Sequence, residues 1–389
     1  MNHSWLKSVL PIAAIFSFRM LGLFMLIPVF SVYARNLEAA TPKLIGIALG
    51  IYGLSQGLLQ IPFGILSDRY GRKPLLILGL LFFISGSLVG ALTDSIYGMI
   101  VARTLQGMGA IGSVLIALLA DLTSEQQRTK AMAVIGISIG VSFSLAMIIS
   151  PLLCSHFGLV GIFYLTGLLA SVGLLLVFFV IPTPTGQLLA KIRSAKLACF
   201  KQTFMNSHLQ KLNISIFFQH MMLTSTFFVI PLLIHQQILL GQLSQQWHFY
   251  LPIILLSFFI MTPLLAFAEK NDAIKKMIVT SVSITLISQF FLSFSHQHLF
   301  SLWTLVLIYF VAFNLLEASI PSLISKQAPS ESRGTAMGIY STSQFIGIFI
   351  GGTMAGYIYY FYGATGIFLT NGLLGLVWLL ITRQIEPNR

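Results

Sequence analysis

Three charged side chains stand inside long apolar segments of this 389-residue sequence: Arg19, Arg103 and Glu317. A charged group at the centre of a bilayer costs about 2.5–3.5 kcal/mol on insertion scales, so it normally faces a partner or a water-filled cavity. Glu317 could take up and release a proton, and His220, in another apolar segment, could titrate near neutral pH. Glu317 and His220 are therefore the candidates for proton exchange.

Each of these residues also has a structural interpretation. Arg103 lies near the end of its apolar segment, where it could form a structural pair or extend to the membrane interface. Its predicted role is therefore either structural or in proton coupling. A single histidine such as His220 is often simply packed and hydrogen-bonded. Arg19 lies deeper, where it could favour the ionised form of a nearby acid or bind an anionic group.

Polar side chains recur on single helical faces inside these apolar segments. Tyr52, Gln56 and Gln60 are four residues apart, and Asn314 precedes Glu317 by three, which places each set on one face of a helix. Such stripes predict a polar cavity among apolar helices. The candidate cavity residues are Arg19, Tyr52, Gln56 and Asn314, together with Tyr340 and Gln344, which are also four residues apart.

The elements that position these residues must be membrane-spanning helices. Of the residues, 56% are hydrophobic and only 8% are charged, whereas a soluble domain averages about 25% charged residues. A segment of about 20 mainly apolar residues can span a bilayer as a helix. Twelve such spans are predicted, near residues 9–33, 44–66, 75–93, 98–120, 131–154, 159–181, 211–235, 247–268, 277–295, 300–324, 335–361 and 365–382.

The predicted fold is an all-α membrane protein whose twelve transmembrane helices form two pseudo-symmetric six-helix bundles. The longest connection divides the chain into an N-terminal bundle over 1–181, a cytoplasmic linker over 182–210 and a C-terminal bundle over 211–389. Arg128 and Arg333 each stand three residues before an Ala-Met pair, after the fourth and tenth spans. This spacing of six spans indicates two repeats related by an axis along the membrane normal, an architecture typical of transporters.

The excess of positive charge is explained by topology. The net charge is +12, and with a cytoplasmic N-terminus all 22 Lys and Arg residues lie on the cytoplasmic side except Arg35, Lys43 and two within spans. Both termini are therefore predicted to be cytoplasmic, and no nucleic-acid partner is expected. Cys154 and Cys199 are too few for a disulfide framework, and no Cys/His cluster has ligand spacing, so we predict no metal and no cofactor.

The most specific motif lies between the second and third spans and reads GILSDRYGRKP over residues 64–74. A loop that follows the positive-inside rule explains its basic residues but not its aspartate or its two glycines. Here the chain resembles the major facilitator superfamily, whose signature loop reads G-x-L-x-D-R-x-G-R-K. The resemblance implies a conformational switch in which the aspartate lies near charged residues after span four and against the start of span eleven. Its residues would be Gly64, Asp68, Arg69, Gly71 and Arg72, with Asp121 and Arg128.

Further stretches extend this resemblance over the whole chain. The sequence Arg103–Ala110 matches the family's signature for span four. The antiporter signature of span five matches in part, with Ala146 and Ser150 at positions where glycine is expected. The stretches 18–22, 50–54 and 313–318 resemble the YajR branch of proposed drug/proton antiporters.

The resemblance implies a secondary active transporter in the bacterial inner membrane. Its expected activity is proton-coupled efflux, or antiport, of a small amphipathic molecule by alternating access. Its expected partners are a small-molecule substrate, protons and membrane lipid, and it is expected to act as a monomer. A proton-independent facilitator, a proton-coupled importer and a non-transporting membrane receptor are the alternatives.

Glycine-rich patterns that suggest enzymes lack their structural context. The pattern Gly107-x-Gly109-x-x-Gly112 resembles a dinucleotide-binding fingerprint but follows no strand. Two Gly-x-Ser-x-Gly patterns, beginning at residues 53 and 136, have no evident His-plus-carboxylate pair, so no enzyme activity is predicted. Glycines four residues apart, including Gly136 with Gly140 and Gly347 with Gly351, are instead expected to let helices touch.

Overall fold

The computed structural model describes residues 4–182, 202–329 and 332–385, without the side chains of residues 4–8, 125, 126, 128 and 129. The linker predicted over 182–210 therefore lies mostly outside the described residues. The chain divides into two compact units. Unit 1 comprises Met1–Ala40 and Ile51–Ala195, and unit 2 comprises Thr41–Gly50 and Lys196–Arg389. The boundary at Gly50 falls within a single helix.

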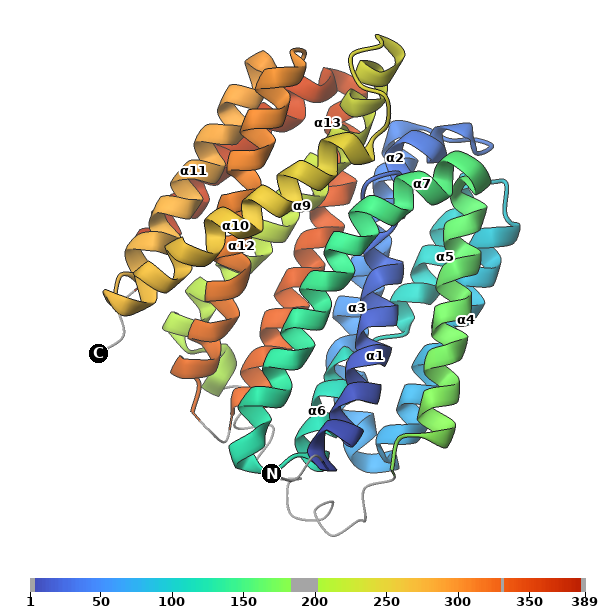
Figure 1. Ribbon diagram of the computed structural model, residues 1–389, viewed down its shortest axis with the longest axis vertical. Helices are drawn as coiled ribbons and strands as arrows, with labels where there is room; N and C mark the ends of the chain where they lie inside the picture. The colour runs from blue at the N-terminus through green and yellow to red at the C-terminus, as the bar shows by residue number, and fades with distance from the viewer. Residues whose placement is uncertain (1–3, 183–201, 330–331, 386–389) are drawn as a thin grey trace. The chain divides into compact units, whose positions relative to one another are not determined.

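The described part of unit 1 is helical apart from short connections. Its elements are α1 (Ser4–Phe24), α2 (Phe30–Tyr33), the 3-10 helix η1 (Ala34–Asn36), α3 (Pro42–Tyr70), α4 (Arg72–Leu92), α5 (Ile96–Met108), α6 (Gly112–Leu122) and α7 (Glu125–Phe179). The start of α3 belongs to unit 2. The long helix α7 packs against both α1 and α4, as the green ribbon in Figure 1 shows.

The first predicted span, 9–33, is not one continuous helix. Helix α1 ends at Phe24, and a run of turns leads to the short helix α2. The cause is Pro28, because proline has no N–H to donate and its ring clashes with the carbonyl four residues earlier. That carbonyl belongs to Phe24. It accepts a hydrogen bond of 3.1 Å from the N–H of Ile27, three residues later, as in a 3-10 turn.

The fourth predicted span, 98–120, is likewise broken. Helix α5 ends at Met108 and α6 begins at Gly112. At Gly109 the backbone leaves the helical region, with φ −71° and ψ 50°. A Cβ at Gly109 would lie only 2.5 Å from the carbonyl oxygen of Gly79, so the break lets α4 approach this turn closely. The glycines of the dinucleotide-like pattern thus shape a discontinuous membrane helix.

Two glycines divide the longest helices at corresponding places in the two halves of the chain. Gly158 in α7 has φ 61° and ψ −162°, and Gly363 in α13 (Arg333–Arg383) has φ 62° and ψ −156°. A positive φ favours glycine because a side chain would be strained there. Each glycine falls between two predicted spans, so α7 and α13 each supply two passes.

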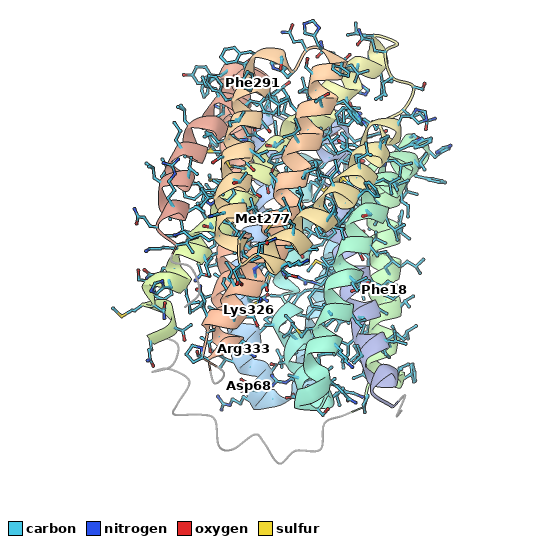
Figure 2. The ribbon with its side chains drawn as sticks, turned by 60° about the vertical axis from the view of Figure 1, so that its left-hand side comes forward. Phe18, Asp68, Met277, Phe291, Lys326 and Arg333 are labelled. Atoms are coloured by element: carbon cyan, nitrogen blue, oxygen red, sulfur yellow. The ribbon has the colours of Figure 1, made fainter. Side chains whose placement is uncertain are left out.

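Unit 2 contains α9 (Ser207–Leu239), α10 (Trp247–Lys270), α11 (Ile274–Ser295), α12 (Leu299–Gln327) and α13. Helices α9 and α13 lie side by side. A Cβ at Gly347 or Gly351 would overlap a backbone carbonyl of α9, as the spacing of this pair predicted. Figure 2 places Phe291 at one end of unit 2 and Arg333 at the other.

The described helices account for a twelve-helix membrane fold. Nine are long and apolar enough to cross a membrane, and two of these nine are divided by Gly158 and Gly363. Helix α1 supplies the remaining pass. Gly136 and Gly140 differ from the other glycine pair, because a Cβ at either position would meet no atom within 4 Å. This pair does not bring α7 against another helix here.

Candidate functional site

Glu317 and His220 lie side by side in unit 2. Glu317 is on α12 and His220 is on α9, with 3.7 Å between Oε2 of the acid and Nε2 of the imidazole. The Glu317 side chain is 38% exposed and that of His220 only 6%, so the carboxylate is the more exposed of the two titratable groups. Gln219 on α9 and Gln344 on α13 complete this group. We call these four residues the carboxylate cluster.

The two amides define the hydrogen bonds of the carboxylate cluster. Nε2 of Gln219 donates to Oε2 of Glu317 at 3.0 Å and also lies 3.3 Å from the carbonyl oxygen of Phe313. Nε2 of Gln344 lies 2.8 Å from Nε2 of His220. An amide NH₂ can only donate, so His220 accepts at Nε2 and is neutral in this arrangement. A proton at that nitrogen would require the Gln344 amide to turn over.

The structure separates Asn314 and Tyr340 from the cluster's hydrogen bonds. Nδ2 of Asn314 donates to Oγ of Ser257 on α10 at 3.0 Å. Tyr340 is 5% exposed and belongs to a hydrophobic core cluster that includes Trp378. The donor to Glu317 is instead Gln219, which the sequence analysis did not select. Its only sequence signal is a polar residue next to His220 inside an apolar span.

A second polar network in unit 2 was also not predicted from the sequence. Oγ of Ser225 donates to Oδ1 of Asn371 at 2.8 Å, and Nδ2 of Asn371 donates to Oε1 of Gln289 at 3.1 Å. Nε2 of Gln289 in turn donates to Oγ1 of Thr226 at 3.0 Å. All four side chains are buried. The network ties α9, α11 and α13 together, and its residues on α9 lie five and six positions after His220.

In unit 1, the predicted cavity residues Arg19 and Tyr52 are in direct contact. Nη2 of Arg19 donates to the hydroxyl of Tyr52 at 3.1 Å. The guanidinium of Arg103 lies 4.6 Å from the centroid of the same ring. Nη1 of Arg103 donates to Oε1 of Gln106 at 2.8 Å. Tyr52 therefore lies between two buried cations from α1 and α5.

Gln56 lies one turn after Tyr52 on α3. Its side chain is fully buried, and neither of its amide atoms has a hydrogen-bond partner among the described residues. Gln60, a turn further on, is 4% exposed and has an unpaired Oε1. The polar stripe predicted on α3 is therefore buried, with much of its hydrogen-bonding capacity unused.

Arg72 organises the signature loop. Its Nη1 lies 2.6 Å from Oδ1 of Asp68 and 2.7 Å from Oγ of Ser67, while its Nε donates to Oδ2 of Asp121 at 2.9 Å. One guanidinium thus joins the ends of α3, α4 and α6. Gly71 has φ 96°, which lets the chain turn sharply between α3 and α4. Figure 2 shows Asp68 at that end of α3.

Two further residues of the predicted switch have described contacts, and a third does not. The guanidinium of Arg69 lies 5.2 Å from the ring centroid of Tyr70. Gly64 leaves ordinary space, since a Cβ there would lie 3.6 Å from Oγ of Ser113. Arg128 is in the first turn of α7, and its side chain lies outside the described residues.

A twelve-helix fold with buried charges and the signature loop defines a membrane transporter of the major facilitator type. The profile of the Major Facilitator Superfamily matches residues 12–268 and 212–388, so this chain belongs to that superfamily. The chain is 42% identical over 382 residues to the inner membrane transport protein YajR of Escherichia coli K12, covering 96% of this chain and 82% of that protein. It is therefore a transporter of small molecules and not an enzyme.

Two further proteins are similar to this chain, one in part of its sequence and one in fold. It is 30% identical over 165 residues to the class B tetracycline resistance protein of Escherichia coli, covering 41% of this chain and 40% of that protein. A crystal structure of a mutant of the nucleoside transporter NupG matches 98% of this chain and 99% of its own, with 15% identity and a TM-score of 0.77. This last likeness concerns the fold.

Proposed function

We propose that this transporter is a proton-coupled antiporter that exports a small amphipathic molecule by alternating access. The observation that carries the proposal is the carboxylate cluster. Glu317 lies within the span formed by α12, is 38% exposed and has an amide donor, while His220 lies 3.7 Å away. A neutral amide can bond either form of the acid after turning over. Glu317 can therefore exchange its proton without losing its partner.

The direction of transport is proposed from relatives. The class B tetracycline resistance protein carries a drug-resistance name, and export is a direct way for a membrane transporter to confer resistance. The relative YajR is named as an inner membrane protein, and we assign the same membrane here. The positive-inside rule then puts both termini in the cytoplasm. We also propose that the two bundles, 1–181 and 211–389, form a functional monomer with lipid around it.

Arg72 and its two carboxylates are proposed to act as the conformational switch. Arg72 at the start of α4 pairs with one carboxylate on α3 and one on α6. If α3 or α6 shifts away from α4, an ion pair must break. The side chains involved are 14–34% exposed, so water weakens each pair only in part. Such a cluster could favour one state of the transport cycle over the other.

The decisive experiment measures proton movement in proteoliposomes. Purified protein is reconstituted with pyranine inside the vesicles, and ethidium, benzenesulfonate and norfloxacin are added in turn. Antiport predicts a substrate-dependent change in internal pH that the parent protein produces and Glu317→Gln does not. Substrate flux without proton movement would indicate a facilitator, and proton movement in the same direction as substrate would indicate an importer. A receptor would produce neither substrate flux nor proton movement.

A further inference from the structure

Two buried cations in unit 1 lack a compensating carboxylate within that unit's described residues. Arg19 and Arg103 are each 2% exposed, and neither forms an ion pair there. The described carboxylates of unit 1 lie elsewhere on the chain: Asp68 and Asp121 contact Arg72, and Glu38 and Asp94 meet through their backbones before α5. Burying an ion without a counter-ion is costly, so this arrangement favours a bound anion.

Unused hydrogen-bonding groups surround these cations. Nε and Nη1 of Arg19, Nε of Arg103, both amide atoms of Gln56 and Oε1 of Gln60 are buried and unpaired in the part of the chain that the structure describes. Buried polar groups in proteins are normally hydrogen-bonded. Tyr52 contacts the guanidinium groups of both Arg19 and Arg103. Gln56 and Gln60 lie on the same face of α3 as Tyr52. The unpaired atoms therefore belong to one neighbourhood.

The break between α5 and α6 brings a helix N-terminus to the same place. A Cβ at Gly112, the first residue of α6, would lie 3.4 Å from Nη1 of Arg19 and 3.3 Å from Nε2 of Gln60. The first backbone N–H groups of a helix have no partner within it and attract negative charge. Discontinuous membrane helices present such ends to anionic substrate groups. A side chain at position 112 would crowd these two polar groups.

We propose that Arg19, Gln60 and the N-terminus of α6 bind the carboxylate of an organic anion, so that the transported molecule is anionic. Nη1 of Arg19 and the amide of Gln60 face the start of α6, where the carboxylate oxygens would accept their hydrogens together with backbone N–H groups. Gln56 supplies a further amide, and Arg103 adds positive charge from beyond Tyr52. The site is buried in this structure, so access rests on the alternating-access cycle proposed above.

The test compares carboxylates with their neutral amides on the purified full-length chain in detergent. Benzoate and naphthalene-2-carboxylate are set against benzamide and naphthalene-2-carboxamide, with melting temperature and calorimetric Kd as readouts. The carboxylates are expected to raise the melting temperature, and the amides are not. Arg19→Gln should weaken carboxylate binding by about tenfold to a hundredfold, as expected for a hydrogen bond to a charged group. Gly112→Ala should also weaken it.

A ligand-free measurement separates binding from a structural role. Arg19→Gln removes a buried charge that lacks a counter-ion, so it should melt no lower than the parent in the absence of carboxylate. A lower melting temperature would show that Arg19 is structural and would overturn the proposal. Arg35→Gln is the matched control, because Arg35 is an exposed cation of the same unit and its loss should leave carboxylate binding unchanged.

Other outcomes would also overturn the proposal. These are equal responses to carboxylates and amides, parental affinity in Arg19→Gln, or a response to phosphatidylglycerol alone, which would assign the site to a lipid headgroup. No proton gradient is present in this assay, which reports carboxylate binding and not proton movement. The anion site and the proton-coupling role of Glu317 can therefore fail separately.

Discussion

A hydrogen bond of 3.0 Å joins Nε2 of Gln219 on α9 to Oε2 of Glu317 on α12. The partner of this intramembrane acid within unit 2 is thus a neutral amide. A cation in the same place would hold the acid ionised, whereas an amide offers both a donor and an acceptor. This arrangement suits an acid that changes its protonation state during a transport cycle.

Glu317→Gln is expected to uncouple transport from protons. The substituted amide keeps nearly the same size but carries no titratable proton, so gradient-driven accumulation of substrate should be lost. Substrate exchange without a gradient should continue. Vesicle uptake with and without an imposed pH gradient measures both rates. Gradient-driven transport at the parental rate in a well-folded variant would rule out the coupling role.

His220→Gln is expected to change the pH dependence of transport more than its maximal rate. Nε2 of His220 accepts from Gln344 in this structure, and protonation would break that bond and place a cation 3.7 Å from the carboxylate. A glutamine at 220 can accept the same hydrogen bond but cannot become charged. Rates measured from pH 5 to 8 should therefore vary less than in the parent. An unchanged pH profile would mean that His220 is only packed.

Asp68→Asn is expected to shift the transporter toward the state that is open to the cytoplasm. The change removes the ion pair with Arg72 and leaves Asp121 as its carboxylate partner. Partly exposed pairs contribute up to about 1 kcal/mol, so the population ratio should change by up to about fivefold. Spin labels at positions 130 and 270, in a background without Cys154 and Cys199, report the distance change. Asp94→Asn is the control, and identical distance distributions in Asp68→Asn and parent would refute the switch.

Two glycine substitutions should have opposite effects on stability. A Cβ at Gly86 would lie 2.6 Å from the carbonyl oxygen of Ala102, so Gly86→Ala should force α4 and α5 apart and cost about 1–3 kcal/mol. Gly136→Ala meets no atom within 4 Å and should gain up to about 1 kcal/mol from the better helix propensity of alanine. Melting temperatures in detergent compare the two. Equal effects would show that close packing at Gly86 is unimportant.

Asn371→Leu is expected to lower stability by about 1–3 kcal/mol, because it removes the donor to the buried Oε1 of Gln289 and one of the two acceptors of the Ser225 hydroxyl. If the network also positions α9, proton exchange at the carboxylate cluster should slow as well. Chemical denaturation and exchange rates measured on one preparation would separate these effects. A variant as stable as the parent would contradict the structural role of this network.

Much of the fold follows from the sequence because hydropathy and glycine chemistry are local. The length of each apolar run determines where a helix can cross a bilayer, and Gly158 and Gly363 end helices where a side chain would be strained. The position of a charged residue within an apolar span can likewise be read from the local sequence. Glu317 could be singled out because an acid in an apolar span is costly wherever the span lies. The loop residues from Gly64 to Arg72 were likewise recognisable as a motif.

Only the tertiary structure decided which partners these residues have. Asn314 and Glu317 share a face by spacing, yet α12 is rotated so that Asn314 bonds Ser257 on α10 while Gln219 on α9 bonds the acid. The break after α5 depends on the approach of Gly79 as well as on Gly109. Helix rotation and close approach are fixed by packing among segments far apart in the chain. Periodicity within one segment therefore determines which residues are polar and central, and the packed helices determine what each of them contacts.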